Sequence, residues 1–149
     1  MTSIVPGTWI KVFRVSNAGI RYWHHGIVIV VGDTPAKSQV VHSSDGDKTM
    51  DPLYICQTSL ETFLHGGSNA QVVDEEPAFN NDDIVARARQ HVGYMHTRLP
   101  TRNCEHFASW CATGSTFSRQ IHLQCVAGGA FALTIGAMSA IALYITRNL

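Results

Sequence analysis

The chain has 149 residues, no net formal charge and a hydrophobic fraction of 45%, which suits one folded domain with a single core. That fraction excludes intrinsic disorder as the main state of the chain. Lysine and arginine do not gather into a stripe, so no nucleic-acid partner is expected. The four cysteines form no spaced framework and the N-terminus lacks a signal-peptide pattern, which predicts a reduced, cytosolic environment for the folded part.

The first third of the chain is typical of antiparallel strands. Apolar and polar residues alternate along 8–15, which predicts a strand after an initial turn. The β-branched run 22–31 predicts a buried strand that ends before Gly32, and 39–42 predicts a short strand beyond the next turn. Together these segments predict a meander of antiparallel strands.

The rest of the globular part shows weaker signals. Residues 60–64 fit either a short helix or the end of a strand, and residues 71–73 fit a further short strand. A helix is expected to begin at a cap among the polar residues 81–83 and to run to about Val92, where Gly93 ends it.

The C-terminal segment differs in polarity from everything before it. Residues 125–146 contain no charged side chain. A helix of about 20 residues crosses a hydrocarbon core of roughly 30 Å, so this run predicts a transmembrane helix, with a buried core helix as the alternative. We therefore expect a globular domain over 1–118 and a hydrophobic membrane anchor over 119–149. The simplest arrangement is a single-pass C-terminal anchor with the domain in the cytoplasm.

Cys104 is the sharpest candidate for a catalytic residue. Asn103 is expected to cap a helix over 104–111, which places Cys104 in the first turn. The helix dipole and the free N–H groups at that position favour a thiolate, and the same N–H groups can serve as an oxyanion hole. The alternative is a buried and inert cysteine.

A thiolate nucleophile needs an imidazole nearby, and three histidines lie on predicted strands. Alternation places His24 on one face of its strand and His25 on the other, so one of the two faces the packed helix. His42 ends the next strand, and in a hairpin of the two strands its ring can approach the first imidazole. A histidine pair can orient and polarise a catalytic imidazole. For each histidine alone, a purely structural role is the alternative.

A metal centre is not expected. Cys104, His106 and Cys111 lie close in sequence, but a helix directs His106 about 200° away from Cys104, so the three cannot converge on one ion. The sequence has no C-x-x-C or H-E-x-x-H pattern, no glycine-rich phosphate loop and no G-x-S-x-G elbow. No metal and no cofactor are therefore predicted.

Several motifs together resemble the lecithin–retinol acyltransferase superfamily. NCEHF at 103–107 is similar to its NC-box, and HHGI at 24–27 is similar to its H-box. VVH at 40–42 matches the strand that ends in the family's second histidine. The opening PGTWIKVFR at 6–14 and the stretch 92–107 also look like the family. The C-terminal segment resembles the anchor of the small phospholipase A/acyltransferase branch.

This resemblance implies a fold, an activity and roles for three residues. The implied fold is α+β, an antiparallel sheet packed on helices, of the permuted papain-like NlpC/P60 type in which the histidine precedes the cysteine. Cys104 is implied as the nucleophile, His24 as the general base and acid, and His42 as the orienting imidazole. The implied activity is a membrane-anchored phospholipase A1/A2 and acyltransferase on glycerophospholipids, through a cysteine thioester and without a catalytic metal. The phospholipid membrane is the implied partner.

Two features leave alternatives open. Residue 25 is usually aromatic in the family, and the strand of the H-box is longer than usual before Gly32, so His25 remains a second candidate for the base. Some picornavirus non-structural proteins carry the same motifs, which makes a non-enzymatic membrane or interaction factor the alternative function. A papain-like peptidase or amidase is a third.

Overall fold

The fold is given by a computed structural model of the chain. It describes residues 4–15, 19, 21–43, 54–65, 69–94 and 104–115, all within the unit Met1–Ser118. The second unit, Arg119–Leu149, holds the predicted transmembrane segment 125–146 and lies outside the described residues, as does the predicted helix cap Asn103. Within the described part, no helix is both long and apolar enough to cross a membrane.

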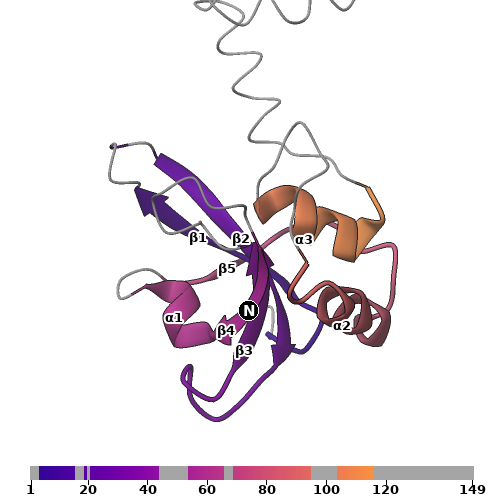
Figure 1. Ribbon diagram of the computed structural model, residues 1–149, viewed down its shortest axis with the longest axis horizontal. Coiled ribbons are helices and arrows are strands. Elements are labelled where there is room, and N and C mark those ends of the chain that lie inside the picture. Colours follow the sequence, from indigo (N-terminus) through magenta and orange to yellow (C-terminus); the bar gives the residue numbers. More distant parts are fainter. Residues whose placement is uncertain are drawn as a thin grey trace, which may run out of the picture. The chain divides into compact units, whose positions relative to one another are not determined.

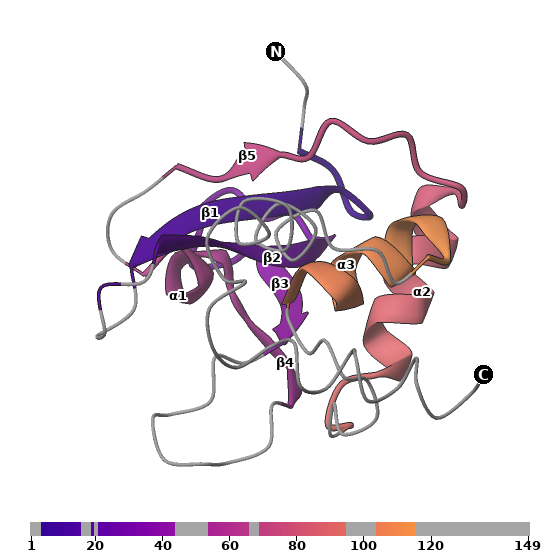
Figure 2. The ribbon, with the colours of Figure 1, turned by 90° about the horizontal axis from the view of Figure 1, so that it is seen from above.

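Among the described residues, five strands form one antiparallel sheet in the order β4-β3-β2-β1-β5. They are β1 (Trp9–Val15), β2 (Arg21–Val30), β3 (Gln39–Ser43), β4 (Ile55–Ser59) and β5 (Gln71–Val72). Figure 2 shows them side by side from β5 to β4. The meander predicted from the first three strands is confirmed, whereas β4 is a strand that the sequence did not indicate.

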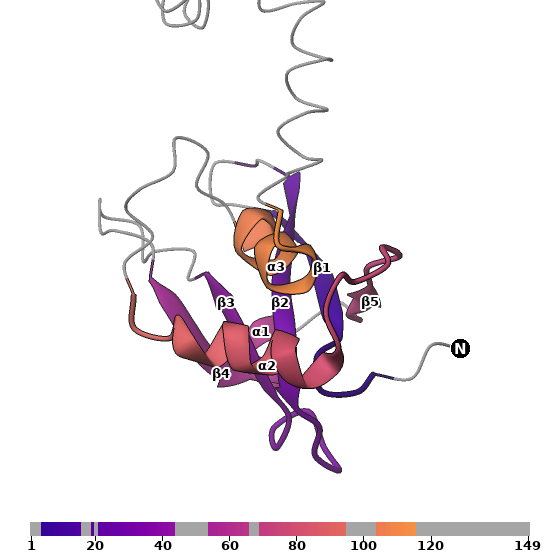
Figure 3. The same cartoon turned by 90° about the vertical axis from the view of Figure 1, so that its right-hand side faces the viewer.

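Helices pack on both faces of this sheet. α1 (Leu60–Leu64) lies on one face, while α2 (Asn81–Gln90) and α3 (Cys104–Thr113) lie on the other (Figure 1 and Figure 3). The predicted α+β class, an antiparallel sheet with helices, is therefore confirmed. Of the two alternatives for 60–64, the helix forms because Ser59 caps it: the Ser59 hydroxyl accepts a hydrogen bond from the Thr62 N–H at 3.1 Å.

The predicted boundaries of α2 are wrong by one or two residues. The N-cap is Asn80, whose side-chain oxygen accepts from the Asp83 N–H at 2.9 Å, so the cap precedes the predicted range. Asn80 has the extended backbone that a cap requires, whereas Asn81 is already helical. The helix ends at Gln90, earlier than expected, and Gly93 follows with a φ of +87°.

Alternation along the strands divides the core into two clusters, one on each face. The cluster against α2 and α3 contains Trp9, Ile27, Ile29, Val41, Ile55, Ile84, Ala88, Phe107, Ala108, Cys111 and Ala112. The cluster toward α1 contains Ile10, Val12, Val28, Val40 and Phe63. Odd-numbered residues of β1 and β2 thus face α2 and α3, and even-numbered residues face α1. The adjacent histidines at 24 and 25 therefore point to opposite faces.

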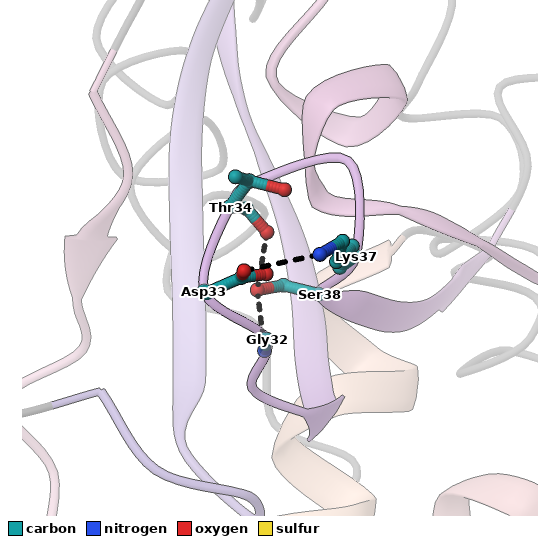
Figure 4. Close-up of polar contacts among 5 residues, drawn as sticks. All are labelled: Gly32, Asp33, Thr34, Lys37 and Ser38. Atoms are coloured by element: carbon teal, nitrogen blue, oxygen red, sulfur yellow. Dashed lines mark hydrogen bonds and ion pairs between the residues drawn. The ribbon is translucent and has the colours of Figure 1, made fainter.

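A compact turn connects β2 to β3 (Figure 4). The buried Ser38 hydroxyl accepts from the Gly32 N–H at 3.0 Å and donates to the Thr34 carbonyl at 3.1 Å. The Lys37 ammonium pairs with the Asp33 carboxylate at 3.0 Å, but both side chains are largely exposed. Because water screens an exposed ion pair, the turn is held mainly by the Ser38 hydroxyl and by the Lys37 and Ser38 N–H groups, which both donate to the Thr34 carbonyl at 3.1 Å.

Candidate active site

His24 and His42 form a buried pair on the face of the sheet that α1 covers. The register of β2 and β3 sets Gly26 opposite His42, which places both rings on this face. His24 Nε2 lies 3.0 Å from His42 Nδ1, and the rings meet edge to face with centroids 4.9 Å apart. The hairpin therefore brings these two imidazoles together, as strand order and alternation predict.

Phe63 of α1 covers this histidine pair. Its ring centroid lies 5.0 Å from that of His24 and 5.2 Å from that of His42. The ring comes this close because Gly26 has no side chain: a Cβ there would lie 2.6 Å from Val40 Cγ1 and 2.9 Å from Phe63 Cε2. The glycine that follows the two adjacent histidines thus makes room for the aromatic cover.

Cys104 is the first residue of α3 and lies against β2. Its Sγ is 3.6 Å from the Trp23 carbonyl oxygen, which belongs to the peptide group directly before His24. The Cys104 side chain is 8% exposed. The predicted position of this thiol in the first turn of a helix is therefore confirmed, and the sulfur lies beside the strand segment that carries both adjacent histidines.

The hydrogen-bond pattern of β2 fixes the side of the strand on which this sulfur lies. Val28 donates its N–H to the Thr8 carbonyl at 3.0 Å and accepts from the Gly7 N–H at 2.7 Å, so the N–H and C=O groups of the even-numbered residues of β2 point toward β1. The Trp23 carbonyl consequently points toward the β3 side, at a position beyond Ser43, where β3 ends. The sulfur thus lies on the β3 side of the β2 backbone, next to the peptide group that joins Trp23 to His24.

His25 lies on the face that α3 covers, in a different environment. Its Nδ1 accepts a hydrogen bond from the Trp9 indole N–H at 3.0 Å, so a neutral His25 carries its proton on Nε2. Burial lowers the pKa of His25 to about 4; the Glu105 carboxylate opposes this shift, and Lys11 and His24 add to it. His25 is therefore uncharged at neutral pH.

Two side chains of β4 contact the outer nitrogen of His42, and sequence reasoning missed both. Thr58 Oγ1 lies 3.0 Å from His42 Nε2, and Cys56 Sγ lies 3.5 Å from the same nitrogen. His42 Nδ1 also lies 3.1 Å from the Ser43 carbonyl oxygen. β4 reads Ile-Cys-Gln-Thr-Ser, without alternation of apolar and polar residues, and so short a segment does not distinguish a strand from a loop.

Cys111, the second cysteine of α3, is a core residue. It is fully buried against the sheet, and burial raises the pKa of its thiol to about 12, with a smaller opposing effect from the Arg87 guanidinium. A thiol with that pKa is not a nucleophile at neutral pH. Cys111 therefore provides an internal standard against which the reactivity of Cys104 can be measured.

His106 is buried within α3. Burial lowers its pKa, while the neighbouring Glu105 carboxylate acts in the opposite direction. In the part of the chain that the structure describes, no group of three or more His, Cys, Asp or Glu side chains is arranged to hold a metal ion.

The fold and these side chains together define a class of protein. A cysteine at the start of a helix lies beside a strand of an antiparallel sheet, and that strand contributes one of two paired imidazoles. This is an α+β protein in which a cysteine at the start of a helix lies beside a strand that carries histidines. The family model for lecithin retinol acyltransferase matches residues 2–117, so the chain belongs to that family and the resemblance drawn from its motifs is confirmed. A search of curated proteins finds no match.

Proposed function

We propose that the chain is a membrane-anchored phospholipase A1/A2 and acyltransferase that acts on glycerophospholipids through a thioester on Cys104. Family membership supports acyl transfer as the type of activity. The observation that carries the proposal is the position of the Cys104 sulfur, 3.6 Å from the peptide oxygen that precedes His24, whose ring is paired with His42 at 3.0 Å. The proposal takes the fold to be the permuted papain-like type, in which the catalytic histidine precedes the cysteine.

His24 is the proposed base in preference to His25. His25 uses its Nδ1 lone pair to accept from the Trp9 indole, and its pKa of about 4 makes it a poor proton acceptor at neutral pH. His24 instead has an imidazole partner, because its Nε2 lies 3.0 Å from His42 Nδ1. A hydrogen-bond acceptor at Nε2 stabilises the doubly protonated ring that forms when His24 takes the proton from sulfur.

The proposed reaction consists of two successive acyl transfers. The Cys104 thiol gives its proton to His24, and the thiolate attacks the ester carbonyl carbon of a glycerophospholipid. The carbon–sulfur bond forms, the ester carbon–oxygen bond breaks, and the proton on His24 passes to the oxygen of the leaving lysophospholipid. Water, an amine or a lysolipid hydroxyl then attacks the thioester carbon and gives its proton to His24. The carbon–sulfur bond breaks, the proton returns to the Cys104 sulfur, and the fatty acid or the acylated acceptor leaves. Backbone N–H groups at the start of α3 are suited to hold the negative oxygen of each tetrahedral intermediate.

The membrane anchor is the part of the proposal that concerns location. The uncharged run 125–146 is long enough to cross a bilayer, and the domain is proposed to face the cytoplasm, where thiols stay reduced. Such an anchor raises the effective concentration of the site at its lipid substrate. Removing 125–149 should abolish flotation of the protein with vesicles. A truncated chain that still floats would contradict the anchor.

Thiol labelling of the full chain tests the assigned nucleophile. Iodoacetamide, with the modified sites quantified by mass spectrometry, should alkylate Cys104 much faster than Cys111, whose pKa is about 12. His24→Ala should slow the labelling of Cys104, while His25→Phe, the matched control on the other face of β2, should leave it fast. Equally slow labelling of both thiols in the unmodified chain would favour a non-enzymatic interaction factor.

Turnover on vesicles tests the reaction itself. The full chain, mixed with vesicles of mixed-acyl phosphatidylcholine, should release fatty acid, and an added ethanolamine lipid should accept part of the acyl groups. Cys104→Ala should reduce both products to the level of vesicles alone, because no other thiol replaces the nucleophile, whereas Cys111→Ala should retain them. Fatty-acid release that persists in Cys104→Ala rules out the assigned nucleophile. Cleavage of peptides in place of lipids would identify a peptidase instead.

A further inference from the structure

His42 has a possible acceptor for its proton at each ring nitrogen. Its Nδ1 faces His24 Nε2 at 3.0 Å and the Ser43 carbonyl oxygen at 3.1 Å, while its Nε2 faces the Thr58 hydroxyl at 3.0 Å. A neutral imidazole carries one N–H, either on Nδ1 or on Nε2. A carbonyl oxygen only accepts a hydrogen bond, whereas a hydroxyl can donate or accept. The two arrangements of the proton therefore have different consequences for His24.

With the proton on Nδ1, His42 donates toward the Ser43 carbonyl and toward His24 Nε2, so His24 has no acceptor in that ring for a proton of its own. With the proton on Nε2, His42 donates to the Thr58 hydroxyl, and its Nδ1 lone pair accepts from the N–H at His24 Nε2. The second arrangement alone gives a doubly protonated His24 an acceptor in His42. That is the form His24 takes once it has received the proton of the thiol.

We propose that Thr58 is a positioning residue, whose hydroxyl holds His42 in the Nε2–H form so that Nδ1 serves as the acceptor for His24. This inference rests on the proposed function, because it assigns Thr58 a role relative to the proposed pair of Cys104 and His24. Thr58 touches neither substrate nor reacting atoms and acts through the ring of His42. Removing its hydroxyl leaves the Ser43 carbonyl to favour the Nδ1–H form.

Thr58 is assigned this role rather than Cys56, although both side chains of β4 reach the same ring. The Thr58 oxygen is 3.0 Å from His42 Nε2, within the normal range for a hydroxyl hydrogen bond. The Cys56 sulfur lies 3.5 Å from Nε2 and 4.0 Å from Nδ1, and a thiol is a weak donor and a weak acceptor. Cys56 directly opposes His42 across the two strands and so provides a matched control on the same ring.

The charged and titratable groups around the histidine pair are unchanged by a substitution at Thr58. On the α1 face, Arg14 donates to the Phe63 carbonyl at 2.6 Å and its guanidinium lies 5.8 Å from the centroid of that ring. On the other face of the sheet lies His25, whose own pKa is affected by Glu105, Lys11 and His24. A change in pH dependence that appears in a Thr58 variant is therefore assigned to the contact with His42.

Three variants of the full chain test the inference: Thr58→Val, Thr58→Ser and Cys56→Ala. In a chain with ¹⁵N-labelled histidine, nitrogen chemical shifts report which ring nitrogen of His42 carries the proton. We expect the Nε2–H form in the unmodified chain and in Thr58→Ser, and the Nδ1–H form in Thr58→Val. A hydrogen bond to a charged group is worth about 1.5–3 kcal/mol, so alkylation of Cys104 at neutral pH should be about tenfold slower or more in Thr58→Val. The serine variant should restore the rate.

The pH of half-maximal alkylation of Cys104 should rise in Thr58→Val. Cys56→Ala should change neither the position of the His42 proton nor the pH profile of alkylation. An unmodified chain with His42 in the Nδ1–H form overturns the inference, even if Thr58→Val does not fold. The inference is also overturned if a folded Thr58→Val keeps the proton of His42 on Nε2 and the pH profile of alkylation unchanged. It is overturned as well if Cys56→Ala moves the His42 proton and the pH profile in the way expected for Thr58→Val. Neither readout needs lipid turnover. If these shifts occur as expected but the protein releases no fatty acid from vesicles, the proposed function is refuted and the role of Thr58 stands.

Discussion

Gly26 is the position at which the structure makes the strongest prediction about packing. A methyl group added by Gly26→Ala lies 2.6 Å from Val40 Cγ1 and 2.9 Å from Phe63 Cε2, far inside the usual carbon–carbon contact of about 3.5–4.0 Å. Both neighbours are fully buried, so neither can move into solvent. We expect the free energy of unfolding to fall by about 1–3 kcal/mol, the usual cost of overpacking a core. Displacement of Phe63 should also disturb the histidine pair and slow alkylation of Cys104.

A second substitution, Val40→Ala, tests whether the contact itself is the cause. It removes Cγ1 and should alone cost about 1–2 kcal/mol, because two buried methyl groups contribute roughly 0.8 kcal/mol each. If the methyl group at position 26 fills the vacated space, the double variant is less destabilised than the sum by about 1 kcal/mol or more. Urea unfolding of the full chain, followed by tryptophan fluorescence, measures all four proteins. Additive effects, or a Gly26→Ala variant as stable as the unmodified chain, would refute this reasoning.

Two further predictions concern a helix cap and a titration. Asn80→Ala removes the acceptor for the Asp83 N–H at 2.9 Å and should lower the free energy of unfolding in urea by about 1 kcal/mol. Asn80→Ser should retain most of the stability. An unchanged unfolding midpoint for the alanine variant would show that the cap contributes nothing. Because the pKa of His25 is about 4 in the folded chain against an ordinary value of 6.5, the unfolded chain binds more protons between these two pH values. The free energy of unfolding is therefore highest, as far as His25 is concerned, above pH 6.5. It falls by up to about 3 kcal/mol as the pH falls toward 4. The stability difference between pH 7 and pH 5 should therefore shrink in His25→Phe, with the lowered pKa of His106 common to both proteins. An equal difference in the two proteins would show that another group causes the pH dependence.

Sequence reasoning predicts those parts of the fold that carry their own periodicity. β1, β2 and β3 each alternate or run apolar over enough residues to be recognised as strands, and the short turns between β2 and β3 leave a hairpin as the natural pairing. β4 (Ile55–Ser59) is as long as β3 but shows neither alternation nor an apolar run, so its place beside β3 depends on pairing in the folded sheet rather than on a local pattern. The cap of α2 was misplaced because polar residues that can serve as caps stand side by side at 80–83.

The candidate site likewise has a part that local sequence patterns predict and a part that they do not. Cys104 and the His24–His42 pair can be predicted because helix starts and strand alternation are local properties of the chain. The side chains that contact these histidines cannot be predicted from local sequence patterns. The Trp9 indole reaches His25 only through the register of β1 and β2, and the β4 hydroxyl reaches the pair only once β4 has docked on β3. Register arises from the packing of the whole sheet, so patterns in a single sequence predict the candidate residues but not the contacts that surround them.

The register of β2 also decides which of the two adjacent histidines joins the imidazole pair. Side chains alternate with a period of two, so a slip of one residue would bring His25 to the paired position and turn His24 toward α3. The irregularity in the pairing of β2 with β3 falls between Val28 and Val30, which lie on the turn side of the histidines. From Arg21 to Ile27, β2 pairs with β1 without a shift. The irregularity in β2 thus lies where it does not exchange the positions of the His24 and His25 rings. The unshifted pairing from Arg21 to Ile27 therefore keeps His24 as the residue that faces the second imidazole.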